Sequence, residues 1–150
     1  MNYLSETIEL SKIVAVTDPC YGEPIWCNTV LDNVLPGEYH IELDKVGGCV
    51  SQLHVIHSDY KAQKLTYEFE DDLCVDSGTM GVFDAAYFFG NAKKESWYQS
   101  NVVSWCNEAS YHISEGKGVI SESGHGDGMY SLYVARNAEG QIVAFLIDFI

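Results

Sequence analysis

The sequence predicts an α+β fold in which antiparallel β-sheet dominates, as a sandwich or a strongly curved sheet, with one main helix packed on it. Three observations lead to this prediction. Segments with alternating apolar and polar residues recur along the chain, turn sequences rich in Gly, Asn and Pro separate them, and only residues 95–108 have clear helical spacing. A chain of 150 residues with 47% hydrophobic content is long enough for one domain, residues 1–150, with its own core.

The first half of the chain contains the signals of a β-hairpin. Residues 8–16 are apolar enough for an opening strand region, which ends at Asp18-Pro19 because proline cannot donate to a ladder. Residues 39–43 alternate as a half-buried strand does, Gly47-Gly48 makes a turn, and residues 49–57 form the partner strand.

The second half adds a strand, the helix and another hairpin. Residues 65–69 alternate as a strand, whereas residues 83–89 suit a helical turn, a buried strand or a loop equally well. In residues 95–108 the helical spacing puts two tryptophans on one face, which should pack on the sheet. Residues 130–136 and 141–149 flank a turn from Asn137 to Gly140 and form the clearest hairpin of the chain.

The charge is strongly acidic. There are 22 acidic and 8 basic residues, Arg136 is the one arginine, and the formal net charge is −14. Nucleic-acid binders need clustered Lys and Arg, and anionic membranes repel such a chain, so neither direct nucleic-acid binding nor membrane binding is expected. The charge favours a partner with a basic surface, a divalent cation, or a target whose natural ligand is a polyanion; its plainest interpretation is solubility.

Cysteine usage indicates a reducing compartment. The five cysteines have no C-x-x-C spacing, and the N-terminus has no basic and apolar leader. No apolar run reaches the length of about 20 residues that spans a bilayer. We therefore expect free thiols and a cytoplasmic protein.

Three short segments stand out as candidate functional motifs. Ser123-Gly-His-Gly-Asp-Gly-Met-Tyr130 precedes the last hairpin, and its glycines permit positive φ and close approach of a ligand. The others are Asp18-Pro-Cys-Tyr21 and Val75-Asp-Ser-Gly78, the latter followed by Gly81-Val-Phe-Asp84.

Together, in this order, the segments resemble the DUF4241-like family of small uncharacterised bacterial and phage proteins. The resemblance spans most of the chain. It implies a compact β-rich domain carried by phages or their hosts, with no activity to transfer, and a host cytoplasm as the location if the protein is phage-encoded. His125 stands where the family pattern suggests an aromatic residue, which would alter specificity if that position contacts a ligand.

Metal binding has weak support in the sequence. Asp18, Asp76, Asp84 and Asp127 could bind Ca²⁺ or Mg²⁺, but aspartate beside Pro or Gly more often closes a turn. His54 and His57 lie three apart in a strand and point to opposite faces, which disfavours a shared zinc. We therefore expect no cofactor.

Catalytic signatures are equally weak. A metal-assisted hydrolase could use Asp76, His125 and Asp127, but there is no G-x-S-x-G elbow and no phosphate-binding loop before a helix. Most aromatic residues should be core, although any that line an open pocket beside the glycine loop would stack on a flat ligand.

The leading hypothesis is a non-enzymatic acidic binding protein that inhibits a host defence factor or sequesters a small ligand. The residues expected to bind are Asp18, Tyr21, Asp76, Ser77, Gly78, Ser123, Gly124, His125, Gly126, Asp127 and Tyr130. The alternatives are the hydrolase and a nucleic-acid mimic, the latter suggested by six acidic residues and no base in residues 68–84.

Overall fold

The larger of two antiparallel sheets contains both hairpins expected from the sequence. A computed structural model of the chain describes residues 2–150. The larger sheet has six strands in the order β1-β4-β5-β11-β10-β6. Their bounds are Thr7–Leu10 for β1, Gly37–Val46 for β4, Cys49–His57 for β5, Glu68–Val75 for β6, Gly128–Arg136 for β10 and Ile142–Asp148 for β11. The turns at Gly47-Gly48 and at Asn137 to Gly140 lie where they were predicted.

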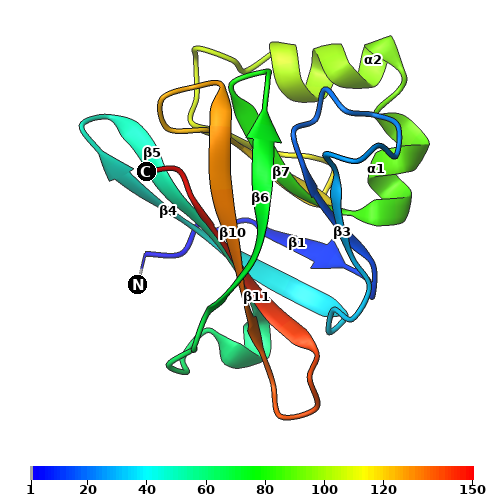
Figure 1. The fold of residues 1–150 in the computed structure, drawn as a ribbon. Coiled ribbons are helices and arrows are strands. Elements are labelled where there is room, and N and C mark those ends of the chain that lie inside the picture. The colour runs from blue at the N-terminus through cyan, green and yellow to red at the C-terminus, as the bar shows by residue number, and fades with distance from the viewer. Residues whose placement is uncertain (1) are drawn as a thin grey trace.

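The smaller sheet lies against the larger one and completes a sandwich (Figure 1). Its order is β3-β2-β7-β9-β8, with β2 at Val14–Thr17, β3 at Thr29–Leu31, β7 at Thr79–Asp84, β8 at Tyr111–Ile113 and β9 at Gly118–Glu122. One hydrophobic core contains side chains of both sheets, among them Val16, Met80, Leu53 and Phe145. Alternating residues of each sheet thus face a shared interior, as the period-two pattern requires.

The sequence predicts one helix over residues 95–108, but the structure has no continuous α-helix there. Residues Glu95–Tyr98 form α2, Gln99–Val103 continue as a π-helix, and turns follow; a second helix, α1, occupies Ala85–Asn91. Asn101 donates from its side chain to the Trp97 carbonyl, and the Trp105 indole donates to the Asn101 carbonyl. Side-chain bonds of this kind compete with the regular helical ladder and favour a π-bulge.

The helical segment nevertheless packs on the sheet as expected. Trp97 and Trp105 are both buried, in a second cluster with Phe83 and Ile120 of the smaller sheet. The helices lie on the side of the molecule opposite the β4–β5 hairpin (Figure 1). The central strands β2, β7 and β9 of this sheet therefore contribute side chains both to the core between the sheets and to the cluster under the helices.

Two strand predictions need correction at their boundaries. Residues 8–16 do not form one strand region, because β1 joins the larger sheet and β2 the smaller one. In the segment 65–69 the strand begins only at Glu68, since Leu65 and Tyr67 pack instead against a third cluster on the outer face of the larger sheet.

The cysteines and the helices agree with the expectations from composition. All five cysteines are free thiols. Among residues 2–150, no helix has the length and apolar character needed to cross a membrane.

Candidate functional site

Asp18 joins two of the three sequence motifs. It follows β2 directly, and its side chain is fully buried. One carboxylate oxygen accepts the backbone N–H of Cys20 at 2.8 Å and the hydroxyl of Ser77 at 2.7 Å. The other accepts the backbone N–H groups of Asp76 and Ser77, each at 2.7 Å. A buried charge needs such partners, and here they lock the turn after β6 onto the end of β2.

A second connection between the same motifs lies nearer the surface. The hydroxyl of Tyr21 donates a hydrogen bond to the carboxylate of Asp76. This bond, with partial burial, raises the pKa of Tyr21 far above its usual range. Tyr21 therefore stays protonated and holds the Asp76 side chain in place at any physiological pH.

The glycine run is a folded turn tied to the central motif. The Ser123 N–H donates to the Gly78 carbonyl at 3.1 Å. The hydroxyls of Ser123 and Tyr130 both donate to the Gly126 carbonyl, at 2.9 and 2.7 Å. Gly124 has φ of 59°, and a Cβ there would lie 2.7 Å from the Phe149 carbonyl oxygen. Hydrogen bonds within residues 123–130 and to Gly78 therefore hold this turn in a defined conformation.

The three motifs converge on one open groove. β10 pairs with β6 so that Gly128 lies opposite Val75 and Met129 opposite Cys74, which brings Asp127 to the same end of the strands as Asp76. The groove has a volume of about 490 Å³. It is lined by Tyr21, Trp26, Cys74, Val75, Asp76, Asp127, Gly128 and Met129.

The predicted site residues divide into lining and supporting groups. Three of them line the groove: Tyr21, Asp76 and Asp127. Seven support its walls by the contacts above or adjoin them in the turns: Asp18, Ser77, Gly78, Ser123, Gly124, Gly126 and Tyr130. His125 is exposed and does not belong to the lining, so the three groups of the hydrolase hypothesis do not share this groove.

The sequence does not single out two prominent residues of the groove lining, Trp26 and Met129. Trp26 is 87% exposed and Met129 is 62% exposed. Single exposed apolar side chains are common, but these two line the same groove and so form a shared apolar surface. The signal for Trp26 was its place in a loop between Pro24 and Asn28, outside any alternating pattern. By contrast, Phe88 and its aromatic neighbours in α1 belong to the cluster under the helices.

Two other candidates from the sequence have structural roles. Asp84 is the N-cap of α1, where its carboxylate accepts the Tyr87 N–H at 3.3 Å and the Ser11 N–H at 3.1 Å. His57 is buried, its Nε2 lies 3.1 Å from the Pro36 carbonyl oxygen, and its ring packs edge-on against Tyr39. His54 is only partly buried and points to the other face, as the strand period predicts.

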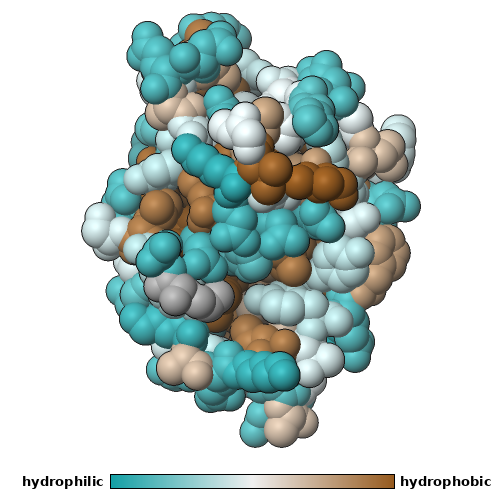
Figure 2. Space-filling view, turned by 90° about the vertical axis from the view of Figure 1, so that its left-hand side faces the viewer, coloured by the Kyte–Doolittle hydropathy of each residue, from teal (hydrophilic) through white to brown (hydrophobic). Residues whose placement is uncertain are grey.

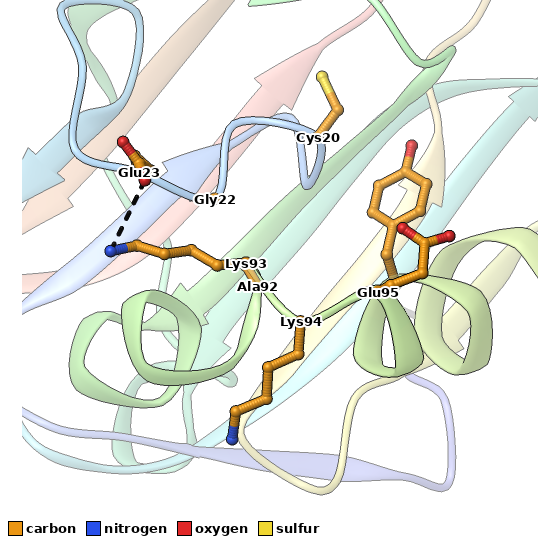
Figure 3. Close-up of a pocket in the computed structure, with 8 residues that line it drawn as sticks. Cys20, Gly22, Glu23, Ala92, Lys93, Lys94 and Glu95 are labelled. Atoms are coloured by element: carbon orange, nitrogen blue, oxygen red, sulfur yellow. Dashed lines mark ion pairs between the residues drawn. The ribbon is translucent and has the colours of Figure 1, made fainter.

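The loop that follows Asp18 borders a second pocket, beside the helices (Figure 3). This pocket has about 320 Å³ and is lined by Cys20, Gly22, Glu23, Ala92, Lys93, Lys94, Glu95 and Tyr98. Lys93 reaches toward Glu23 at 3.8 Å, whereas Lys94 points away. A Cβ on Gly22 would lie 2.9 Å from the Ala92 carbonyl group, so the loop backbone rests directly on the end of α1.

The thiols near the groove are poor nucleophiles. Partial burial and the Asp18 carboxylate raise the pKa of Cys20 far above its usual range, and burial also raises the pKa of Cys74. Because the thiolate is the reactive form, the raised pKa values lower the nucleophilicity of both side chains near neutral pH. The site has exposed apolar walls and two carboxylates.

Comparison with known proteins places the chain in a family. The family model described as a protein of unknown function, DUF4241, matches residues 10–147. The chain belongs to the DUF4241 family. No curated protein and no solved structure matches it.

The family match confirms the resemblance drawn from the three motifs. In this DUF4241 protein the motifs lie far apart in the chain but share hydrogen bonds and border one groove. Their common place in the structure gives a physical reason why they occur together: each one builds or supports part of the same surface.

Proposed function

We propose that this DUF4241 protein is a non-enzymatic acidic binding protein whose groove takes a basic side chain, foremost arginine, from a protein partner. The observation that carries the proposal is the pairing of an exposed Trp26 and Met129 with the carboxylates of Asp76 and Asp127 around one groove.

The chemistry of the groove fits a guanidinium group. An aromatic face attracts a planar cation, and carboxylates receive its N–H groups in bidentate geometry. Arginine combines both properties, whereas a lysine ammonium offers only a point charge. Because the Tyr21 hydroxyl occupies one oxygen of Asp76, the second oxygen and the whole Asp127 carboxylate are the acceptors offered to such a ligand.

The overall charge of the protein favours a basic partner over an anionic one. A formal net charge of −14 raises the local concentration of cations and speeds encounter with a basic surface. The groove walls are pre-organised by Asp18, which reduces the entropy lost on binding. In the phage setting implied by the resemblance, the partner would be a host defence factor.

Isothermal titration with an acetylated hexa-arginine peptide tests the proposal. We expect Trp26→Ala to weaken binding about tenfold although it leaves the charge unchanged, because the cation–π and apolar contacts are lost. Asp127→Asn should weaken binding by a similar factor. A hexa-citrulline peptide, isosteric but neutral, should not bind.

A matched control separates the groove from general attraction between opposite charges. Asp32 is exposed and lies outside the groove, so Asp32→Asn makes the same charge change as Asp127→Asn. The control should change affinity less than about twofold, since screened surface charges contribute little. Equal losses for both aspartate variants, with no loss for Trp26→Ala, would reject the groove as the binding site.

Imitation of a nucleic acid is a second candidate, supported by the edge strand β6. Glu68, Asp71 and Asp72 are exposed along this strand, and within residues 2–150 none of the three forms an ion pair with a lysine. A partner held mainly by these charges would be released steeply between about 50 and 300 mM salt, because the Debye length shortens over that range. A groove complex that includes Trp26 should retain much of its affinity.

A further inference from the structure

A second group of chemically active side chains lies on the outer face of the β4–β5 hairpin, away from the proposed binding groove. Glu42, Asp44 and His54 each bring one potential ligand atom to within 4.8 Å of the other two. His54 Nε2 lies 3.1 Å from an Asp44 carboxylate oxygen and 3.2 Å from the Gln52 amide oxygen. This ring nitrogen therefore faces oxygen atoms of two neighbouring side chains.

A β-bulge brings these side chains together. Next to the Gly47-Gly48 turn, Val46 pairs with Cys49 and Lys45 with Val50, but Asp44 then pairs with Gln52. The skipped residue, Ser51, shifts the register by one, so that Glu42 lies opposite His54 instead of Leu53. Bulges commonly re-aim side chains at functional sites, and this one turns a histidine toward two carboxylates on the same face.

The first carboxylate is held in place before any ligand arrives. Glu42 is 8% exposed, and one of its oxygens accepts the Asn2 N–H at 2.8 Å. Asp44, in contrast, is exposed and free to adjust its rotamer. Among residues 2–150, neither of these two carboxylates forms an ion pair with a lysine or arginine. Asp44 pairs with His54.

We propose that Glu42, Asp44 and His54 form a zinc-binding site. Imidazole nitrogen with carboxylate oxygen is a donor set that Zn²⁺ prefers, whereas Mg²⁺ and Ca²⁺ take oxygen ligands alone. Ligand atoms about 2.1 Å from a tetrahedral zinc are separated from one another by roughly 3.4 Å. The three ligand atoms lie within 4.8 Å of one another, with 3.1 Å between His54 Nε2 and the Asp44 oxygen, and rotation of the exposed Asp44 side chain would adjust them to a metal. Gln52 or water supplies the fourth ligand.

The position of the site suits a metal that solvent can reach. Figure 2 shows the side of the molecule that carries the β4–β5 hairpin and the N-terminus; hydrophilic side chains cover most of it and hydrophobic ones form smaller patches. The site shares no residue with the lining of the groove, so its test does not depend on the proposed function.

Titration of chelator-stripped protein with Zn²⁺ in a non-coordinating buffer tests the proposal by calorimetry. We expect one equivalent to bind, and we expect His54→Gln and Glu42→Gln each to weaken binding at least about tenfold. His125→Gln is the matched control, because His125 is exposed and does not belong to the cluster. It should leave zinc affinity unchanged.

A second readout identifies the ligand directly and guards against misfolded variants. In proton–carbon spectra of the wild-type protein, zinc should shift the ring signals of His54 and leave those of His125 in place. Absence of zinc binding, binding that survives in the triple variant Glu42→Gln/Asp44→Asn/His54→Gln, or binding of Mg²⁺ or Ca²⁺ in preference to Zn²⁺ would each overturn the proposal.

Discussion

Ser77 donates both its backbone N–H and its hydroxyl to the carboxylate of Asp18, at 2.7 Å each. These two residues are separated by 59 positions, yet they form the contact that fixes the β6–β7 turn against the loop after β2. The groove wall that carries Asp76 therefore has a buried ionic support beneath it. Asp18 is buried and supports the site from beneath, whereas Asp76 and Asp127 line the groove.

Replacement of Asp18 by asparagine should destabilise the protein by about 3 kcal/mol, because a buried donor would then face other donors. Both carboxylate oxygens accept two hydrogen bonds, so either orientation of the amide places its NH₂ group against N–H or O–H groups. Denaturant unfolding measures the change. Asp32→Asn, at an exposed position, is the reference, and a loss below about 0.5 kcal/mol for Asp18→Asn would contradict the ionic support.

Gly124→Ala should cost clearly more stability than Gly47→Ala. Both glycines have φ of 59°, so the backbone strain of about 1–2 kcal/mol is common to the two variants. Only at Gly124 would the new Cβ collide with backbone, 2.7 Å from the Phe149 oxygen, whereas nothing lies within 4 Å at Gly47. We expect an additional loss of about 1–3 kcal/mol at Gly124, measured by thermal and denaturant unfolding. Equal losses would show that the glycine run is not packed against the C-terminal strand.

The stability of the wild-type protein should fall as the pH drops from 7.5 to 5, in part through His112. Its ring stacks on Trp105 with an interplanar angle of 8°, its Nε2 lies 3.2 Å from the Asn101 amide oxygen, and burial lowers its pKa. Below about pH 6.5 the unfolded chain binds a proton that the folded protein resists, so this contribution is present above that pH and is lost as the pH falls through the folded pKa.

The variant His112→Gln should therefore show a shallower acid decline of the denaturation midpoint than the wild type. His125→Gln, which alters an exposed histidine, should follow the wild-type curve. Parallel curves for all three proteins would mean that the neutral form of His112 does not stabilise the contact with Trp105.

Cys20 should react slowly with iodoacetamide even though it is exposed. The raised pKa leaves little thiolate at pH 8, so we expect a rate at least about tenfold below that of the same cysteine in urea-unfolded protein. Peptide mapping by mass spectrometry separates Cys20 from the other thiols. A folded-state rate equal to the unfolded one would show that the Asp18 carboxylate and partial burial do not suppress the thiolate.

The hairpins could be predicted from local sequence because their signals are local. Alternation along residues 39–43 and the glycines at 47 and 48 specify the β4–β5 hairpin, and Asn137 with Gly140 specifies the last turn. The helix over residues 95–108 was only partly predictable. Its tryptophan spacing correctly indicated the buried face, but the side-chain bonds of Asn101 that favour a π-helix leave no periodic signal.

The candidate site could not be predicted in full from the sequence, because it depends on contacts between segments far apart in the chain. The motifs marked Asp18, Asp76 and Asp127, but not which of them is buried, because that depends on how the end of β2 meets the turn after β6. Trp26 and Met129 have the apolar character of core residues, and only their position at the groove distinguishes them. Glu42 and His54 became neighbours through a bulge that no turn rule predicts.

The three tryptophan indole N–H signals in a proton–nitrogen spectrum test most directly whether the groove of Trp26, Asp76 and Asp127 takes a basic side chain. The Trp97 indole donates to the Tyr87 hydroxyl and the Trp105 indole to the Asn101 carbonyl, both in the buried cluster under the helices, whereas Trp26 is 87% exposed. Hexa-arginine peptide should shift the Trp26 indole together with the Asp127 and Gly128 amides, and leave the other two indoles unchanged. Shifts elsewhere on the acidic surface with an unmoved Trp26 signal would contradict the claim.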